Sequence, residues 1–256
     1  MNTVGRNYQV LLRAALCIAW LINALAAIPA LAQPASCDYQ ITDVDWSVDA
    51  AFIGAREPHP EASMLSNIYV DANTGSDTND GSQQSPLKTI TKATTVATGT
   101  GDAPTTIYVA AGTYSAADNG EAFPINMKSW ISIIGEGAEV VVLDAGGSSI
   151  VVNISSVSGA ALSGCTIKGG SGNNGGGVVC NNSQVTISGN HITENTADSG
   201  AGIYCLGKSP VIQENIISSN TATGRLGMGG GIFTVSASPQ ILDNVFSGNS
   251  GDMVGA

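Results

Sequence analysis

Three aspartates in one short segment could bind a metal ion. Asp71, Asp77 and Asp80 lie in "YVDANTGSDTNDGSQQSP" (residues 69–86), among Asn, Gly, Ser and Thr. Carboxylate, amide and carbonyl oxygens are the ligands that Ca²⁺ prefers, so the segment predicts a calcium site, and Ca²⁺ is the one cofactor that the sequence suggests. The same residue types also form Asx-turns, in which a carboxylate accepts hydrogen bonds from nearby backbone N–H groups. Both interpretations stay open at this stage.

A second group of carboxylates, Glu214 and Asp243, occupies equivalent positions in two consecutive sequence repeats. Equivalent residues on stacked β-strands lie about 5 Å apart. Two carboxylates at that separation are candidates for the catalytic pair of a retaining glycosidase, or for a shared cation site. The alternative is that both are solvated side chains at a turn.

Aromatic side chains suggest a sugar-binding surface. Tyr204 and Phe233 are expected to follow Val151 and Val179 in one outward-facing row of the repeats. Exposed aromatic rings can stack on sugars, so we predict Tyr204 and Phe233 as carbohydrate-binding residues. The alternative is that a loop or a partner domain covers this row.

The cysteines and histidines give weaker signals. Cys180 and Cys205 stack one repeat apart, and Cys165 aligns with Asn190. Neighbours in register on parallel strands have unfavourable geometry for a disulfide, which favours buried thiols, although a secreted protein can form the bond. The two histidines lie far apart in the sequence and do not suggest a zinc site.

The C-terminal half of the chain repeats itself. One unit occurs as "GGGVVC" (175–180), "GAGIYC" (200–205) and "GGGIFT" (229–234), and a second follows it as "VTISGNHITEN", "PVIQENIISSN" and "PQILDNVFSGN". Equivalent residues are 25 and then 29 positions apart, and we expect a degenerate earlier copy from Gly147. Short strands with such a period predict the coils of a parallel β-helix, with three strands to a coil.

Stacking the copies predicts ladders of equivalent side chains. The four inward ladders are Ile150–Val178–Ile203–Ile232, Val152–Cys180–Cys205–Thr234, Leu162–Ile187–Ile212–Ile241 and Ile167–Ile192–Ile217–Phe246. Two further ladders, at turns, are Asn190–Asn215–Asn244 and Asn195–Asn220–Asn249. Asparagine amides can bond from coil to coil, and asparagine suits turns.

These patterns predict an all-β fold, a single-stranded right-handed parallel β-helix with a short N-terminal capping helix. The helix is expected in "SPLKTITKATTVA" (85–97), where Leu87, Ile90, Ala93 and Ala97 follow helical spacing. Residues 67–146 would form the cap and the first coils, and residues 147–256 the repeats. Because the sequence stops just after a coil, at "GNSGDMVGA", we expect the C-terminus to be truncated.

The N-terminus predicts export. Arg6 and Arg13, an apolar run over 11–28 and the motif Ala30-Leu31-Ala32 are typical of a secretory signal peptide (1–32) cleaved after Ala32, with a membrane anchor as the alternative. Residues 33–66 read as a linker. Cleavage removes two of nine basic and none of twenty acidic residues, which changes the net charge from −11 to −13. That charge argues against nucleic acid and anionic membranes as partners.

Residues 68–146 resemble a domain of uncharacterised function that heads many secreted bacterial β-helix proteins. The matching pieces are "YVDANTGSDTNDGS", "SPLKTITKA", "IYVAAGTY", "NGEAFPINM" and "ISIIGEG". The residues after 147 look like the right-handed β-helix repeat of the pectate-lyase superfamily. "GGGI" and "FSGN" are also similar to the repeats of polymorphic outer-membrane proteins. The pectate-lyase resemblance implies a fold that hosts lyases, hydrolases, adhesins and scaffolds.

Three functions follow from these patterns. The first is a secreted or cell-surface, non-catalytic module that binds a polysaccharide or a surface glycan, as adhesins do. The second is a lyase or hydrolase of acidic polysaccharides. The resemblance implies a cationic base for a lyase, but Lys168, Lys208 and Arg225 fall at different repeat positions or in loops. The third is a scaffold for further domains. The oligomeric state is not predicted.

Overall fold

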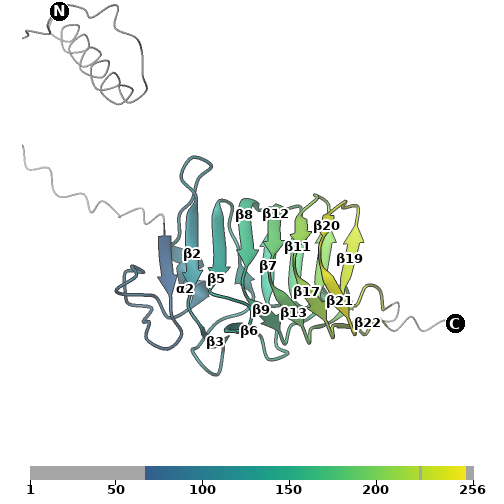
Figure 1. Ribbon diagram of the computed structural model, residues 1–256, viewed down its shortest axis with the longest axis horizontal. Coiled ribbons are helices and arrows are strands. Elements are labelled where there is room, and N and C mark those ends of the chain that lie inside the picture. The colour runs from purple at the N-terminus through teal and green to yellow at the C-terminus, as the bar shows by residue number, and fades with distance from the viewer. Residues whose placement is uncertain (1–66, 225–226, 252–256) are drawn as a thin grey trace, which may run out of the picture. The chain divides into compact units, whose positions relative to one another are not determined.

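Residues 67–224 and 227–251 are described by a computed structural model, and they form a parallel β-solenoid (Figure 1). This confirms the predicted all-β class. The predicted signal peptide (1–32) and linker (33–66) lie outside the described residues. No helix within the described ranges is long and apolar enough to cross a membrane.

The strands form four sheets, numbered here in the order in which a coil visits them, and every strand pair is parallel. Sheet 1 contains β1 (Asn67–Val70), β2 (Thr105–Val109), β5 (Ile131–Gly135), β8 (Ser158–Ser163), β12 (Gln184–Ser188), β16 (Val211–Gln213) and β20 (Gln240–Leu242). Sheet 2 contains β3 (Gly112–Ser115), β6 (Val141–Asp144), β9 (Thr166–Lys168), β13 (His191–Thr193), β17 (Ile216–Ser218) and β21 (Val245–Ser247). Sheet 3 contains β10 (Ser171–Asn174), β14 (Thr196–Ser199), β18 (Thr221–Ala222) and β22 (Ser250–Gly251). Sheet 4 contains β4 (Ile125–Asn126), β7 (Val152–Ser155), β11 (Val178–Asn181), β15 (Ile203–Leu206) and β19 (Ile232–Val235).

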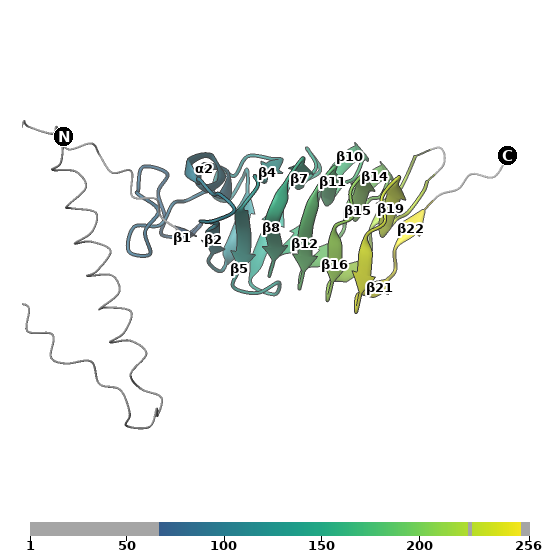
Figure 2. The ribbon, with the colours of Figure 1, turned by 90° about the horizontal axis from the view of Figure 1, so that it is seen from above.

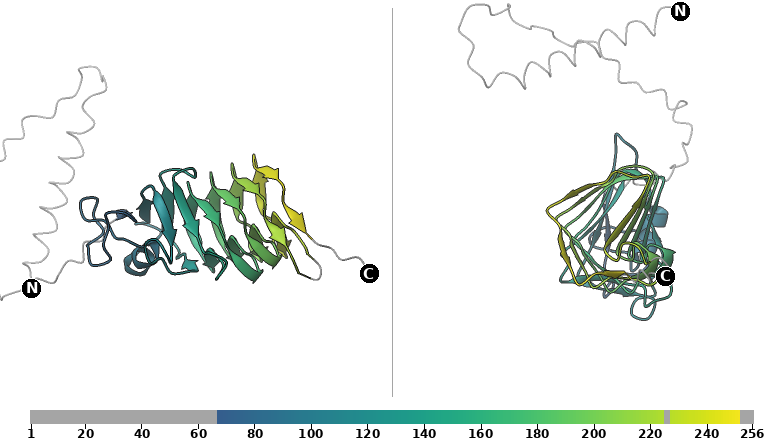
Figure 3. Two further views of the ribbon diagram at one scale, coloured as in Figure 1. Left: turned by 90° about the horizontal axis from the view of Figure 1, so that it is seen from below. Right: turned by 90° about the vertical axis from the view of Figure 1, so that its right-hand side faces the viewer.

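The later coils have four strands, not the three expected from the sequence. One coil runs through β12, β13, β14 and β15 before β16 begins the next, and β14 is the additional strand. Figure 2 shows the strands of successive coils side by side, and the end-on view in Figure 3 shows the sheets surrounding a common interior. The short strands of sheet 3 are rich in Gly, Ser, Thr and Ala, which hides them from a search for apolar runs.

In two of the four predicted inward ladders the register is confirmed throughout, although their last members, Ile241 and Phe246, are exposed. Ile187 pairs with Leu162 and Ile212, and Ile192 pairs with Ile167 and Ile217. These side chains are all fully buried. They form part of one apolar core because each coil covers the inward side chains of its neighbour.

The other two inward ladders and the outward row were predicted with the wrong first residue. In each of them, the correct residue lies two positions further along the chain. Val178 pairs with Val152, not Ile150, and Cys180 pairs with Ile154, not Val152. Asn153, not Val151, is therefore next to Val179 in the outward row. The error came from equating Gly147 with the later glycine triplets. Gly147 instead lies in a turn, where its N–H donates to the Gly169 carbonyl.

The asparagine ladders are also confirmed. Asn215 Oδ1 accepts hydrogen bonds from the N–H and the Nδ2 of Asn190, and Asn215 makes the same donations to Asn244. The second ladder repeats this pattern from Asn195 to Asn249 by way of Asn220. Asn190, Asn195, Asn215 and Asn220 are buried. Each amide therefore connects coils while satisfying backbone groups at a turn.

The expected helix is present as α2 (Ile90–Val96), with Thr89 as its N-cap, and it packs against β1, β2 and β4. Ile90 and Ala93 are buried, as the spacing predicted, whereas Leu87 precedes the helix and bridges to Val70. The buried carboxylate of Glu121 accepts hydrogen bonds from the first N–H groups of the helix, those of Ile90 at 2.7 Å and Thr91 at 2.9 Å. Glu121 thus supplies the acceptors that the first turn of a helix lacks.

Two glycines at one repeat position give a matched test of packing between coils. Gly164 and Gly189 both have left-handed backbone angles, with φ of 68° and 62°. A Cβ at Gly189 would meet nothing within 4 Å, whereas one at Gly164 would lie 2.4 Å from the Gly135 carbonyl oxygen. Gly189→Ala should lower the free energy of unfolding by about 1 kcal/mol, because of the backbone conformation alone. Gly164→Ala should lower it by at least about 1 kcal/mol more, because the backbone at Gly135 must move. Urea unfolding measures both, and equal losses would contradict this account.

Candidate functional site

Two tyrosines stack on the outer face of sheet 1 in the first coils. Tyr69 of β1 and Tyr108 of β2 are in register, with ring centroids 5.4 Å apart and an interplanar angle of 22°. Their inward neighbours, such as Ile68 and Ile107, are buried, so strand alternation turns the tyrosines outward. Tyr108 is 39% exposed. The pair therefore presents aromatic surface to the solvent.

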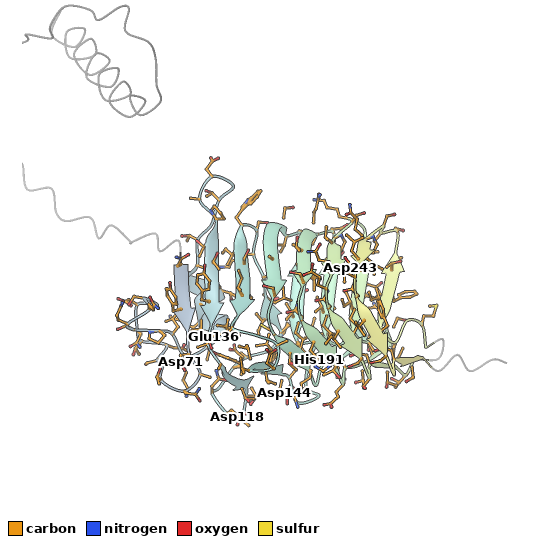
Figure 4. All side chains as sticks on the ribbon, viewed as in Figure 1. Asp71, Asp118, Glu136, Asp144, His191 and Asp243 are labelled. Atoms are coloured by element: carbon orange, nitrogen blue, oxygen red, sulfur yellow. The ribbon has the colours of Figure 1, made fainter. Side chains whose placement is uncertain are left out.

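The tyrosines line a hollow of about 300 Å³ near the C-terminal ends of β1, β2 and β5. We call it the tyrosine hollow and define it by five of its lining residues, Tyr69, Asp71, Gln83, Tyr108 and Glu136. Its volume is at the lower end of the range for small-ligand sites. Asp71 and Glu136 lie at the same end of the solenoid, far from Asp243 (Figure 4). No Lys or Arg is among the described residues that line it.

Both carboxylates of the tyrosine hollow are held in place by the backbone. Asp71 Oδ1 accepts hydrogen bonds from the N–H groups of Asn73 and Thr74, and its Oδ2 accepts one from the Thr74 hydroxyl. Partial burial alone would raise the pKa of Asp71, but these hydrogen bonds outweigh it and lower the pKa below its ordinary value. Glu136 Oε2 accepts a hydrogen bond from the Ala111 N–H at 3.1 Å, and the Glu136 N–H donates to Val109.

The groups in this arrangement can make the contacts that a sugar ring needs. Tyrosine rings offer flat apolar surface, and the carboxylates and the Gln83 amide can exchange hydrogen bonds with hydroxyl groups. A catalytic site would need an acid, base or nucleophile in contact with a partner that activates it. Among the described lining residues, the hydrogen bonds of Asp71 and Glu136 go instead to backbone groups and to the Thr74 hydroxyl.

The carboxylates of the three predicted calcium ligands accept hydrogen bonds from different parts of the chain. Asp71 closes a turn with Asn73 and Thr74, and Asp80 accepts from the Ser82 N–H. Asp77 accepts from the N–H groups of Lys88 and Thr89 and from the Thr89 hydroxyl, directly before α2. Within residues 67–224 and 227–251, no group of three Asp, Glu, His or Cys side chains could hold a metal ion together. The hydrogen bonds of Asp71 and Asp80 match the Asx-turn alternative, whereas those of Asp77 reach residues further along the chain. Calcium binding stays a prediction.

Glu214 and Asp243 lie at exposed turns with left-handed backbone angles, φ 56° and 52°. The Glu214 N–H donates to the Leu242 carbonyl, so the two turns are stacked as predicted. Gly164 and Gly189 hold the same place in earlier coils with similar φ values, which ties the position to turn geometry. A catalytic role for the two carboxylates stays a prediction.

The predicted sugar-binding pair Tyr204 and Phe233 is in register, with ring centroids 5.9 Å apart, but Tyr204 is only 9% exposed. The chain between sheets 3 and 4 passes close to the start of this row. A Cβ on Gly175 would be 2.4 Å from Val179 Cγ2 and 3.1 Å from Tyr204 Cβ. The expected exposure is therefore wrong for Tyr204, which is buried. Phe233 is partly exposed.

The thiols of Cys165, Cys180 and Cys205 are free and buried, as the favoured prediction had it. Cys180 and Cys205 are in register on β11 and β15. Burial raises the pKa of Cys165 to about 12. The adjacent Cys180 thiol and burial raise the pKa of Cys205 as well. The raised pKa values keep Cys165 and Cys205 protonated, whereas the hydrogen bond with Cys205 lowers the pKa of Cys180.

The sequence did not predict a contact between His191 and the hydroxyl of Ser218. His191 Nε2 lies 2.9 Å from Ser218 Oγ on sheet 2, and Ser218 also contacts the Thr193 hydroxyl at 3.3 Å. The sequence could have indicated this contact. His191 is in register with Ile216 on the next coil, and Ser218, two residues further along that strand, faces the same side of sheet 2. A nucleophilic serine also needs a group that orients the histidine, and no hydrogen bond to His191 Nδ1 is found among the described residues. Nearby Lys168 pairs with Asp144 at 3.5 Å.

The tyrosine hollow also has a sequence signal that was missed. The triplet Ile-Tyr-Val occurs at 68–70 and again at 107–109, and its two copies pair residue for residue. This repeat lies before the obvious ones and is interrupted by α2. Glu136 has no comparable signal.

Comparison with known proteins gives a family but no activity. Residues 73–254 match the family model described as "Protein of unknown function (DUF1565)". No curated protein and no solved structure matches the chain.

Proposed function

Because the chain belongs to the DUF1565 family of proteins of unknown function, we propose its function from its geometry: it is a non-catalytic module that binds carbohydrate in the tyrosine hollow. The observation that carries the proposal is the stacked pair Tyr69–Tyr108 beside fixed carboxylates. A sugar ring presents an apolar C–H face and a rim of hydroxyl groups. Tyrosine faces and carboxylate acceptors complement these two features.

The position of the hollow on a rigid support favours this function. Val70 and Val109, next to the two tyrosines in β1 and β2, are buried, and the strands are tied to β5 by the continuous parallel ladder. A preformed site loses little conformational entropy when a ligand binds. This distinguishes the tyrosine hollow from the Tyr204–Phe233 row, whose Tyr204 is buried.

The proposal includes the wider setting expected from the sequence. The protein would be secreted or displayed at the cell surface, as adhesin-like modules are, after loss of residues 1–32. Its solenoid would have the right-handed, pectate-lyase-like form, with α2 as the N-terminal cap. The burial of Ile90 and Ala93 against the first coils supports the cap.

Tyr108→Ala is expected to abolish retention on the polysaccharides that the purified protein binds. Loss of one stacked ring should weaken binding at least about tenfold, the equivalent of 1.4 kcal/mol. Pull-down on insoluble polysaccharides, followed by titration with oligosaccharides, measures the effect. Tyr108 is partly exposed, so circular dichroism should show an intact fold.

Phe233→Ala is the matched control because Phe233 belongs to the sugar-binding row expected from the sequence. It should leave binding unchanged. Binding that survives Tyr108→Ala but is lost in Phe233→Ala would move the site to the last coils and contradict the proposal.

A further inference from the structure

The charge of the tyrosine hollow restricts the sugars that it can accept. Asp71 and Glu136 supply two carboxylates, and the described lining residues include no Lys or Arg to neutralise them. The chain as a whole has a net charge of −11. A uronate, whose own carboxylate would enter the same hollow, would be repelled.

Both the carboxylates and the tyrosine rings of the hollow favour a positively charged ligand. A carboxylate forms stronger hydrogen bonds with an ammonium group than with a hydroxyl group. The faces of Tyr69 and Tyr108 carry negative electrostatic potential, which also attracts cations. A ligand that combines a sugar ring with a positive charge would use the rings and the carboxylates together.

We infer that the ligand of the tyrosine hollow is an amino sugar with a free amino group, presented by a glucosamine-type polymer or glycan. This inference rests on the proposed function, since it specifies the sugar bound at the same site. The ammonium group would lie by Glu136 and Asp71, and the apolar face of the sugar ring would lie against Tyr108. The expected order of affinity is amino sugar first, neutral sugar second and uronate last.

Three β-1,4-linked oligosaccharides that differ chiefly at one ring position test the inference. These are oligomers of glucosamine, of N-acetylglucosamine and of glucose, compared by calorimetric titration at about pH 6, below the pKa range of free amines. Oligogalacturonate is the acidic comparison. The glucosamine oligomer should bind about tenfold more tightly than the other two, the equivalent of one charge-assisted contact. Added salt should reduce this preference.

Glu136→Gln is the diagnostic variant. Glutamine keeps an oxygen for the Ala111 N–H, so the loop stays in place while one charge is lost. The preference for glucosamine over the N-acetylated oligomer should fall about fivefold. Glu139→Gln, an exposed carboxylate that does not line the hollow, is the control and should preserve the preference. Asp71 is unsuitable because it organises its own turn.

The possible outcomes separate the two proposals. If glucose or N-acetylglucosamine oligomers bind as tightly as glucosamine, the inference fails, but carbohydrate binding in the hollow stands. Tightest binding of oligogalacturonate overturns the inference in the same way. If a preference for glucosamine survives Glu136→Gln undiminished, its assignment to these carboxylates is wrong. If no oligosaccharide or polysaccharide binds, both proposals fail.

Discussion

Asn215→Ala should lower the free energy of unfolding by about 4 kcal/mol, because it leaves buried polar groups without partners. Asn215 Oδ1 accepts from the N–H and Nδ2 of Asn190 at 3.0 and 3.1 Å. Its Nδ2 donates to the carbonyls of Ile187 and Gln213, both at 2.9 Å. Alanine provides neither function, and the side chain is too deeply buried for water to replace it readily. Chemical unfolding followed by circular dichroism measures the loss.

Asn244→Ala is the matched control in the same ladder. Asn244 makes equivalent hydrogen bonds to Asn215, Ile212 and Leu242, but it is only partly buried. Solvent can replace part of what is lost, so the cost should be about 1 kcal/mol. Asn215→Asp should be as harmful as alanine because an ionised carboxylate cannot donate to the Ile187 carbonyl. Equal effects of alanine at 215 and 244 would show that burial of the ladder is not the source of stability.

Glu121→Ala should cost about 3 kcal/mol, the second large effect, because two buried N–H groups at the start of α2 lose their acceptors. Glu121 is 2% exposed and contacts the N–H groups of Ile90 and Thr91. Glu121→Gln retains one acceptor oxygen and should cost about half as much. Thermal unfolding of the three proteins measures the order.

The Glu121 carboxyl also predicts a pH dependence with a definite sign. Burial raises its pKa, and the opposing hydrogen bonds from Thr91, Ile90 and Ala122 do not cancel that effect. An acid with a raised pKa in the folded state stabilises the fold fully below its unfolded pKa, and that contribution is lost as the pH rises through the folded value. The stability advantage of the native protein over Glu121→Gln should therefore shrink as the pH rises from acidic to neutral. An advantage that grows with pH would contradict the raised pKa.

The sequence predicted the regular part of the fold well. The sheet 1 and sheet 2 ladders and both asparagine ladders follow from spacing alone, since a repeated sequence that stacks must place equivalent residues together. The prediction was wrong at the degenerate copy, where a turn around Gly147 was taken for the start of the repeat. It also missed β14 and its sheet, because strands of small polar residues have no apolar alternation.

The candidate site was much harder to predict. Tyr204 and Phe233 were placed correctly in one row, but a row pattern does not reveal that Tyr204 is buried. The sequence did suggest Asx-turns at Asp71 and Asp80 as an alternative to a calcium site. Such turns could be predicted because each carboxylate bonds to a residue only two or three positions away. The capping of α2 by Glu121, 31 residues from Ile90, has no local signature.

The sequence by itself determined that this chain forms stacked coils, because the repeat period and the alternation of apolar residues specify which side chains face inward. Only the tertiary structure decided where a ligand could bind. The tyrosine hollow joins residues from the ends of β1, β2 and β5, which helix α2 and several loops separate in the sequence. Parallel strands in register bring Tyr69 beside Tyr108, and the following turns fix Asp71 and Glu136 at its rim. Such a meeting of distant segments depends on the path of the whole coil, which no local pattern specifies.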